Sequence, residues 1–523
     1  MSVARSEPAA PGAGLALLTA LSGSFIATMT AQFAGTNIAD IQGGVGASAD
    51  EASWIATVYT MTSFVGIIVS GPLARTFGLR RYFVASAIVF AACAWLCTMA
   101  TGAPSIAALR GIQGVVAGGF GPMAFLVVFM MFKGPRLPFA LALLAFVLLV
   151  SVTCGPVLSA MAEALIGWRG LFLTQFWLGS LLVVAGLSWL PRGAVNWSGL
   201  KTDWGAIALL ATGLASLALV LSQGTRRFWL DNDTVAWALA LGVGAWAGFA
   251  FVNRYSPLPI LNPAKLLDRR FGIPILLNLL FRASFAVTVY LVPQQLALAQ
   301  GYRPLQTSTA LLWCLLPQIA AFPLVWHALH RVDGRVPMMF GLLLCALGTA
   351  LAAFASNQAG GEQLHLTLVL FGVGQMFFLV PTLLIGAGSL RPEDLPTASI
   401  AFNVTTLGGT TLGTGLVSNF VTEREKFHSN VLTEHVSWLD PWASDRVASL
   451  VAALAGRVSD ETASAARAIA LVAGNVRREA WLLAINDGYA IVAVAIAVAA
   501  LGSLVIGRTP PLPRLGTAQG AAP

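Results

Sequence analysis

Long apolar stretches alternate along the chain with short segments that hold most of the charged residues. Fourteen stretches of 20 or more residues contain no Asp, Glu, Lys or Arg. A helix needs about 20 apolar residues to cross a bilayer, whereas barrel strands alternate over about 10 residues. We therefore predict an all-α membrane protein with fourteen transmembrane helices. The stretches are 8–39, 52–74, 82–109, 111–132, 137–162, 170–191, 204–225, 234–253, 283–302, 304–330, 336–361, 363–390, 395–422 and 488–507.

The basic residues of the connecting segments predict the orientation in the membrane. An even number of spans puts both chain ends on one side. The segments on that side hold 17 Lys and Arg residues, whereas the short loops on the other side hold 4. Because Lys and Arg concentrate in cytoplasmic loops, we expect both termini to be cytoplasmic. The net charge of +8 then reflects topology and gives no reason to expect a nucleic-acid partner.

The composition excludes the soluble classes of protein. Charged residues are 10 % of the 523 residues and the mean hydropathy is +0.79, which leaves too few charges to cover a soluble surface. The cysteines lie inside apolar stretches, so we predict packing roles, with neither disulfides nor a metal site. The five are Cys93, Cys97, Cys154, Cys314 and Cys345.

One connecting segment differs from the others in length and charge. Residues 423–487 carry 9 of the 22 acidic residues, and the stretch from Ser459 to Glu479 is rich in alanine. Acids at the start of this stretch and arginines near its end suit a helix and its dipole. We predict that the segment is partly helical and extracytoplasmic.

Two basic turns indicate an internal repeat. The segments that begin at Leu73 and Leu329 share the pattern Leu-x-Arg-x-x-Gly, with a further arginine soon after, and they are 256 residues apart. Each lies between two predicted spans. Repeated halves with a substrate path at their interface are typical of transporters.

Several motifs resemble those of the major facilitator superfamily, and more narrowly of its fourteen-helix drug:proton antiporters of the EmrB/QacA type. The turn after the second span reads Gly71-Pro-Leu-Ala-Arg75-Thr-Phe-Gly78-Leu-Arg80-Arg81. The fourth span contains Leu109-Arg110-Gly-Ile-Gln113-Gly114, and the fifth contains Gly155-Pro156-Val-Leu-Ser159-Ala160. Asp203-Trp204-Gly205 is similar to the start of the family's seventh helix.

The resemblance implies an architecture and an activity. The architecture would be a six-helix bundle in 1–191, two inserted helices with their linkers in 192–270, and a second six-helix bundle in 271–523. The activity would be proton-driven export of amphipathic drugs or toxic compounds across the bacterial inner membrane by alternating access, with no cofactor beyond the proton gradient. The resemblance also implies a periplasmic adaptor of the membrane-fusion type and an outer-membrane channel as partners.

The motif residues allow two interpretations each. Gly71, Arg75, Gly78, Arg80 and Arg81 either anchor a cytoplasmic turn or form a latch that changes between transport states. Gly155 and Pro156 either kink a helix and let it pack closely, or form the pivot that seals the pore.

Two arginines interrupt apolar membrane segments, where a charge is costly and points to function. Arg110 lies about six residues after the turn at 101–104, and Arg282 lies near the middle of 271–302. In the superfamily architecture Arg110 and Arg282 fall on helices that line the central cavity. Amide side chains on the same or neighbouring helices could line the same path, although interhelical hydrogen bonds would explain them equally well. The predicted cavity residues are Gln32, Arg110, Gln113, Asn278, Arg282, Gln294, Gln295 and Gln375.

No Asp or Glu lies in the middle of a predicted span. Family members commonly carry an Asp in the first helix, where this chain has Thr30, and often an Arg in the thirteenth, where it has Thr405 and Thr406. The proton-coupling candidates are therefore acids at span ends, for which a solvated helix end is the simpler explanation. They are Asp40, Glu163, Asp203 and Asp487, and His327 is the alternative.

A cavity with buried arginines and no carboxylate disfavours lipophilic cations. We therefore expect anionic or neutral amphipathic cargo, such as weak organic acids. A transporter for one metabolite or siderophore on the same fold is the alternative, because a fold does not fix a substrate. A membrane-embedded enzyme or receptor would need convergent catalytic groups at one membrane face, and the sequence shows none.

Overall fold

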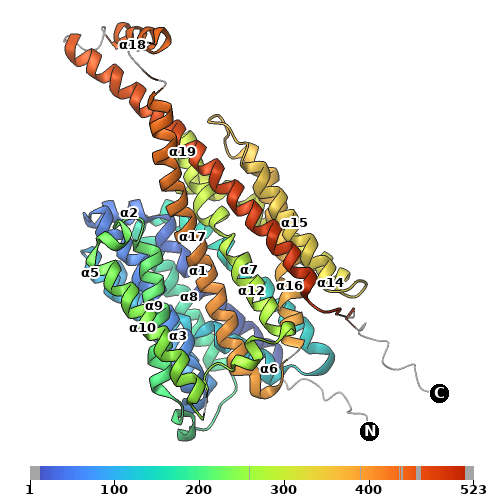
Figure 1. Ribbon diagram of the computed structural model, residues 1–523. Helices are drawn as coiled ribbons and strands as arrows, with labels where there is room; N and C mark the ends of the chain where they lie inside the picture. Colours follow the sequence, from blue (N-terminus) through green and yellow to red (C-terminus); the bar gives the residue numbers. More distant parts are fainter. Residues whose placement is uncertain are drawn as a thin grey trace.

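The computed structural model describes residues 12–257, 259–388, 390–434, 436, 440–454, 461–509 and 511–512. The chain ends predicted to be cytoplasmic lie outside these residues. The described chain forms α-helices joined by short turns and 3-10 segments (Figure 1). The helices are α1 (Ala13–Thr36), α2 (Ile38–Val45), α3 (Ala49–Phe77), α4 (Leu79–Met99), α5 (Ala103–Gly118), α6 (Phe120–Met131), α7 (Leu137–Ile166), α8 (Trp168–Trp189), α9 (Trp204–Gln223), α10 (Asp233–Tyr255), α11 (Pro263–Leu266), α12 (Arg269–Ala283), α13 (Val292–Gln300), α14 (Pro304–Leu329), α15 (Arg335–Ala352), α16 (His365–Gly388), α17 (Leu395–Glu434), α18 (Pro441–Leu454) and α19 (Glu461–Gly502).

Thirteen of the described helical segments are long and apolar enough to cross a membrane, one fewer than the fourteen predicted. The exception is the predicted span 395–422, which forms the first part of α17. This helix has 40 residues, so its length is ample. Its mean hydropathy is low because threonine and glycine recur along it. The predicted class, an all-helical membrane protein, is confirmed. The predicted number of fourteen spans is not matched when spans are counted by length and hydropathy.

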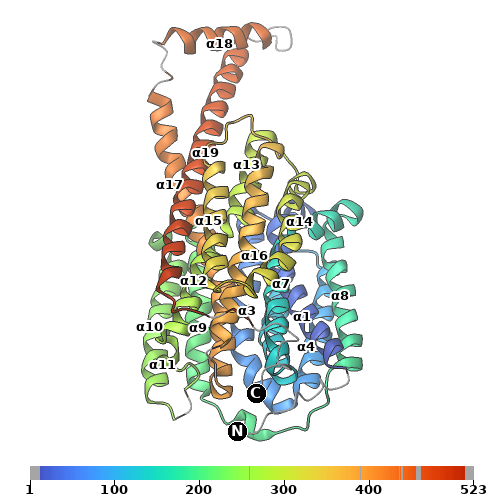
Figure 2. The ribbon, with the colours of Figure 1, turned by 90° about the vertical axis from the view of Figure 1, so that its right-hand side faces the viewer.

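The helices pack in two groups with a pair between them. Helices α1 to α8 contact mainly one another, as do α12 to α19. The groups meet where α7 packs against α14 and α16, and where α17 packs against α3 and α6. The pair α9 and α10 lies beside this junction, because α9 contacts both α3 and α17 (Figures 1 and 2).

An extension projects from one end of the bundle. Helix α17 continues past the predicted span to Glu434, and α19 begins at Glu461 and runs back into the bundle. The short helix α18 lies across their far ends (Figures 1 and 2). The described part of segment 423–487, predicted to be partly helical, is thus helical over most of its length.

The turn between α3 and α4 is held to the end of α8. Gly78 has φ of 84°, a left-handed value that favours glycine, and an added Cβ would lie 3.3 Å from the backbone of Gly193. Arg80 donates a hydrogen bond to the carbonyl oxygen of Leu187 near the end of α8. The chain after α8 then donates from Asn196 N to the carbonyl oxygen of Thr76 at 2.7 Å.

The turn between α14 and α15 repeats this arrangement in the second group. Arg335 Nη1 donates to the carbonyl oxygen of Ile506, just beyond α19, at 2.9 Å. The chain after α19 donates from Leu512 N to the carbonyl oxygen of Leu329 at 2.9 Å. The two basic turns that share a sequence pattern therefore make equivalent contacts. We call these two sets of contacts the first and second straps.

Candidate functional site

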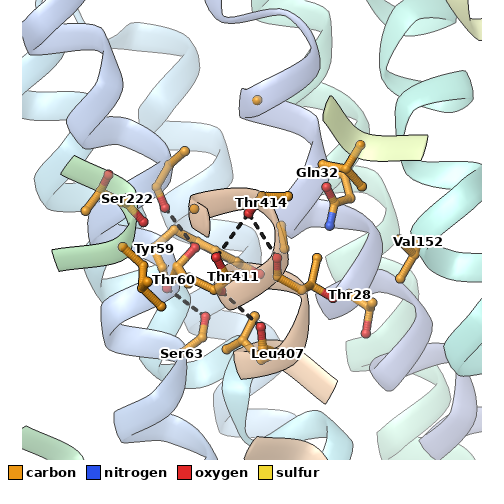
Figure 3. Close-up of a pocket in the computed structure, with 18 of the residues that line it drawn as sticks. Thr28, Gln32, Tyr59, Thr60, Ser63, Val152, Ser222, Leu407, Thr411 and Thr414 are labelled. Carbon is orange, nitrogen blue, oxygen red and sulfur yellow. Dashed lines mark hydrogen bonds between the residues drawn. The ribbon is translucent and has the colours of Figure 1, made fainter. Parts of the chain in front are cut away.

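A cavity of about 650 Å³ lies between the two groups of helices (Figure 3). Its walls come from α1, α3, α7, α9 and α17, with smaller contributions from the α5–α6 junction, α13 and a π-helical segment, Val287–Leu291. The volume is within the range of pockets that hold a drug-sized molecule.

Hydroxyl groups dominate the polar surface of the cavity. Tyr59 and Tyr290 add two phenols to a larger set of serines and threonines, and the amides are Gln32, Gln294 and Asn403. Apolar side chains such as Ile67 and Val152 fill the surface between them. The hydroxyl set is Ser24, Thr28, Ser53, Thr57, Thr60, Ser63, Ser222, Thr225, Thr406, Thr410, Thr411, Thr414, Ser418 and Thr422.

One face of α17 contributes about half of these hydroxyls. Thr406, Thr410 and Thr414 follow at intervals of four residues, so they lie on one side of the helix. Thr414 Oγ1 donates to the carbonyl oxygen of Thr410 at 2.9 Å, and Thr410 Oγ1 donates to that of Thr406 at 3.1 Å. Each hydroxyl oxygen can still accept a hydrogen bond, and each methyl offers apolar contact. Figure 3 shows Thr411 and Thr414 between Thr60 and Thr28.

The cavity opens at the end of the bundle that carries the extension. Its lining there includes the exposed residues Gly35, Gln294 and Arg226. At the other end α6 and α17 close it: an added Cβ on Gly121 would lie 2.1 Å from Asn403 Oδ1. Below that contact the helices continue to touch, because the rings of Phe125 and Phe402 are 5.7 Å apart.

Among the described residues that line the cavity, Arg226 is the one with a charged side chain. Neither Asp nor Glu contributes to that lining. A cationic ligand inside would therefore meet hydroxyl and amide oxygens and no carboxylate. The absence of Asp and Glu from the described lining agrees with the sequence, which has no acid in the middle of a predicted span.

Arg110 lies behind the wall of the cavity and is fully buried. Its Nη1 donates to Gln113 Oε1 at 2.9 Å, and its Nη2 donates to the carbonyl oxygen of Thr30 at 3.1 Å. The guanidinium lies 3.9 Å from the ring centroid of Tyr59, which does line the cavity. Gln113 in turn donates to Gln175 Oε1 at 3.0 Å. Dipoles and a ring thus stabilise this cation, and among the described residues no acid contacts it.

Arg282 is also fully buried, and it has fewer partners. Its Nη1 donates to the carbonyl oxygen of Leu148 at 3.3 Å, while Nε and Nη2 have no hydrogen-bond partner among the described residues. The ring of Phe285 lies 5.0 Å from the guanidinium. Leu148 lines the cavity, so one residue of α7 separates this cation from the cavity.

The other predicted amides divide between the cavity and the helix interfaces. Gln32 and Gln294 line the cavity. Asn278 donates to Thr405 Oγ1 at 2.9 Å, Gln318 donates to Gln375 Oε1 at 2.5 Å, and Tyr489 donates to Gln295 Oε1 at 2.9 Å. These three amides make interhelical hydrogen bonds, the alternative that the sequence left open. Arg110, Gln113 and Arg282 lie behind the wall with them.

The proton-coupling candidates have different surroundings. Asp487 on α19 accepts a hydrogen bond from Arg424 Nε at 2.6 Å, and its Oδ2 lies 2.7 Å from His428 Nε2, both on α17. Asp203 caps α9 by accepting from Ala206 N at 3.0 Å, and this bond lowers the pKa of Asp203.

Asp40 and Glu163 are half-buried near the rim. Within the described chain neither makes a hydrogen bond or ion pair through its side chain. A hydrogen bond joins the two helices near these acids, because Asn37 Nδ2 donates to Ser159 Oγ at 2.9 Å. Asn37 lies three residues before Asp40, and Ser159 lies four residues before Glu163.

The motif residues lie around the cavity and at the closed end. Gly155 lets α7 approach α1, because an added Cβ would lie 3.0 Å from the Cβ of Gln32, a cavity residue. Pro156 is buried inside α7. Gly71, Arg75 and Arg81 are exposed at the first strap.

Sequence reasoning missed most of the cavity residues. The spacing of Thr406, Thr410 and Thr414 in a predicted span was a usable signal, since aligned hydroxyls make one face of a helix polar. Leu221 to Arg226, at the end of an inserted helix, had no such signal.

In the described chain no group of three His, Cys, Asp or Glu side chains is placed to hold a metal ion.

Comparisons with known proteins agree with these features. The sequence profile of the Major Facilitator Superfamily matches residues 20–414. The chain is 26 % identical to the multidrug export protein EmrB of Escherichia coli K12 over 82 % of this chain and 85 % of that protein. It is 22 % identical to the fatty acid resistance protein FarB of Neisseria gonorrhoeae, over 82 % of this chain and 85 % of that protein. The crystal structure of the human organic anion transporter MFSD10 matches with a TM-score of 0.58 at 11 % identity, covering 94 % of this chain and 99 % of that one, which shows a shared fold.

Proposed function

The chain belongs to the major facilitator superfamily, and on that premise we propose that it exports amphipathic compounds of negative or zero net charge in exchange for protons. The superfamily consists of transporters, so the activity we propose is movement of cargo without covalent chemistry. Two helix groups that close the cavity at one end and open it at the other suit alternating access. We place the protein in the bacterial inner membrane, with the extension on the extracytoplasmic side.

The observation that carries the proposal is the absence of any acid from the described cavity lining. Moving a cation out of water is costly unless an opposite charge or strong dipoles replace its hydration. Here Arg110 and Arg282 lie behind the wall, and neither has an acid in contact among the described residues. Their field favours a negative head group, while the hydroxyls can donate to it and the methyl groups can contact its tail. FarB, a relative named for fatty acid resistance, is consistent with such cargo.

Arg282 is the residue on which we base the charge preference. In the part of the chain that the structure describes, two of its three nitrogens have no hydrogen-bond partner although the side chain is fully buried. Coulomb interactions are weakly screened in such an interior, so the charge acts across Leu148 on the cavity. An anion near Leu148 would stabilise this cation, and a cation there would be repelled by it.

For the proton we propose the Asp487–His428 pair as the carrier. Both groups can bind a proton, and together they connect α19 to α17, the helix whose hydroxyl face lines the cavity. Arg424 is the other charged group that contacts Asp487. Protonation of Asp487 would weaken both contacts and loosen α17 from α19. Thr422, at the rim of the cavity, lies only two residues before Arg424.

We also propose that the extension formed by α17, α18 and α19 contacts a periplasmic adaptor that leads to an outer-membrane channel. The extension stands clear of the bundle (Figure 2), which supports a role in contacts beyond the membrane. This partner would place the exporter in a three-part pump.

The test uses two cargo molecules that share a decyl chain and carry head groups of opposite charge. Purified protein in liposomes with an imposed pH gradient is given decyl sulfonate or decyltrimethylammonium, neither of which crosses a bilayer readily. We expect accumulation of the sulfonate and little of the ammonium compound. Arg282→Gln should lower the sulfonate-to-ammonium ratio roughly ten-fold, which corresponds to about 1.4 kcal/mol of differential binding.

Arg282→Lys is the control, because it keeps the charge and should keep most of the preference. Strong transport of the ammonium compound without transport of the sulfonate would overturn the proposal. Equal effects of the Gln and Lys variants would contradict the role of the Arg282 charge.

A further inference from the structure

The end of inserted helix α9 forms part of the cavity wall. Leu221 and Ser222 on its last turn, and Thr225 and Arg226 in the turn that follows, line the cavity. By contrast, the next helix, α10, leaves large apolar side chains such as Trp237 exposed on the outside of the bundle. The inserted pair therefore has a lipid-facing helix and a helix that reaches the transport path.

Side chains on both sides hold this segment in place. Gln223 is fully buried, and its Nε2 donates to Thr57 Oγ1 on α3 at 2.7 Å. On the other side, Asn419 of α17 accepts at Oδ1 from Trp229 Nε1 at 2.8 Å and from Thr225 Oγ1 at 3.5 Å. The segment 221–229 thus bridges one helix of each group, and both of these helices carry cavity hydroxyls.

Two neighbouring arginines in this segment have different surroundings. Arg227 Nη2 lies 2.6 Å from Asp50 Oδ2, so its charge is balanced. Arg226 Nη1 makes a 3.4 Å hydrogen bond to the carbonyl oxygen of Ala49. In the described chain no acid forms an ion pair with Arg226, and its side chain is exposed at the rim. The opening of the cavity therefore carries an arginine that has no ion-pair partner among the described residues.

We propose that the inserted helices supply the residue that selects cargo, and that Arg226 captures negatively charged head groups at the rim. The inference rests on the proposed function, since it names how anionic cargo is recognised. A guanidinium binds carboxylate, sulfonate or sulfate oxygens through paired hydrogen bonds. A charged side chain at the opening of a low-dielectric cavity also raises the local concentration of ions of opposite sign. Cargo then passes from Arg226 to the hydroxyls of α17.

The test compares the concentration of decyl sulfonate that gives half-maximal transport in liposomes for wild type and Arg226→Gln. The variant should raise this concentration roughly five-fold at about 20 mM salt, with the maximal rate unchanged, and the difference should shrink at about 300 mM salt because screening is stronger there. An uncharged decyl glycoside should be transported equally by both. Arg226→Lys, which keeps the charge, should stay within about two-fold of wild type.

The matched control removes the neighbouring ion pair without changing the net charge. Arg227→Gln combined with Asp50→Asn should leave the half-maximal concentration for the sulfonate as in wild type. The inference is overturned if Arg226→Gln transports the sulfonate as wild type does, or if it affects the glycoside equally. Absence of sulfonate transport by the wild type would instead contradict the proposed function itself, so the two failures are distinguishable.

Discussion

Thr30 and Arg110 show at the residue scale how a buried cation is held next to the cavity wall by dipoles. The backbone carbonyl of Thr30 accepts a hydrogen bond from Arg110 Nη2 at 3.1 Å. The hydroxyl of Thr30 is buried without a partner. Arg110 is therefore held next to Thr30 by the dipoles of a backbone carbonyl and of an amide side chain.

Thr30→Asp should change the cargo preference. A carboxylate beside Arg110 would balance its charge and remove its repulsion of cations in the cavity, so decyltrimethylammonium transport should rise and sulfonate transport should fall, on the order of ten-fold in their ratio. Thr30→Asn, which has nearly the same shape without the charge, is the control. If both variants behave alike in liposome transport, the missing carboxylate does not set the preference.

The sequence was sufficient to identify the buried arginines. It was insufficient to show whether their side chains face the cavity, a neighbouring helix or lipid. Arg110 and Arg282 were identifiable because each interrupts an apolar membrane segment. Nearly uniform apolarity along a span hides which side faces lipid, a neighbouring helix or the cavity. The amides illustrate this, since Gln294 lines the cavity and its neighbour Gln295 bonds to Tyr489.

At the scale of elements, α17 combines three roles that its sequence reveals in part. Its first half lines the cavity through threonines, its middle contacts Asp487 through Arg424, and its last turns belong to the extension. The same threonines that make the helix useful for cargo lower its hydropathy below that of the thirteen other spans. The polar threonines of α17 are therefore the physical reason that the two counts of membrane spans differ. A hydropathy criterion gives thirteen spans, whereas a count of charge-free stretches gives fourteen.

The second strap gives a prediction about stability and pH. Asp333 bonds Arg335 and accepts from Thr509 Oγ1 at 2.7 Å. Burial alone would raise the pKa of Asp333, but the hydrogen bonds from Arg335 and Thr509 outweigh it and lower the pKa to about 2. A lowered pKa means that the strap stabilises the fold fully above pH 4 or so, and that this contribution is lost as the pH falls toward about 2.

Asp333→Asn should therefore lower the free energy of unfolding by about 1–2 kcal/mol. Thermal unfolding of the purified protein measures this, and the penalty should be the same at neutral pH and near pH 4 because the carboxylate is ionised at both. A penalty that disappears by pH 4 would mean that the strap does not hold the carboxylate in its charged form.

The whole molecule shows how much an internal repeat contributes to predictability. A short shared pattern at Leu73 and Leu329 indicated two related halves, and the two straps make equivalent contacts in the structure. The inserted helices had no counterpart in the repeat, so no sequence pattern indicated that Arg226 would lie at the cavity. Their position depends on Gln223 and Asn419, whose partners lie far away along the chain.

Proton flux driven by cargo tests the central claim most directly. Liposomes containing the protein and a pH-sensitive dye are prepared without a pH gradient, with the membrane potential held by potassium and valinomycin. Decyl sulfonate added outside should make the interior alkaline, because cargo that enters exchanges for protons that leave, and decyltrimethylammonium should have little effect. Asp487→Asn should bind the sulfonate and give no pH change. An equal or larger response to the ammonium compound, or no response of the wild type to the sulfonate, would contradict the account.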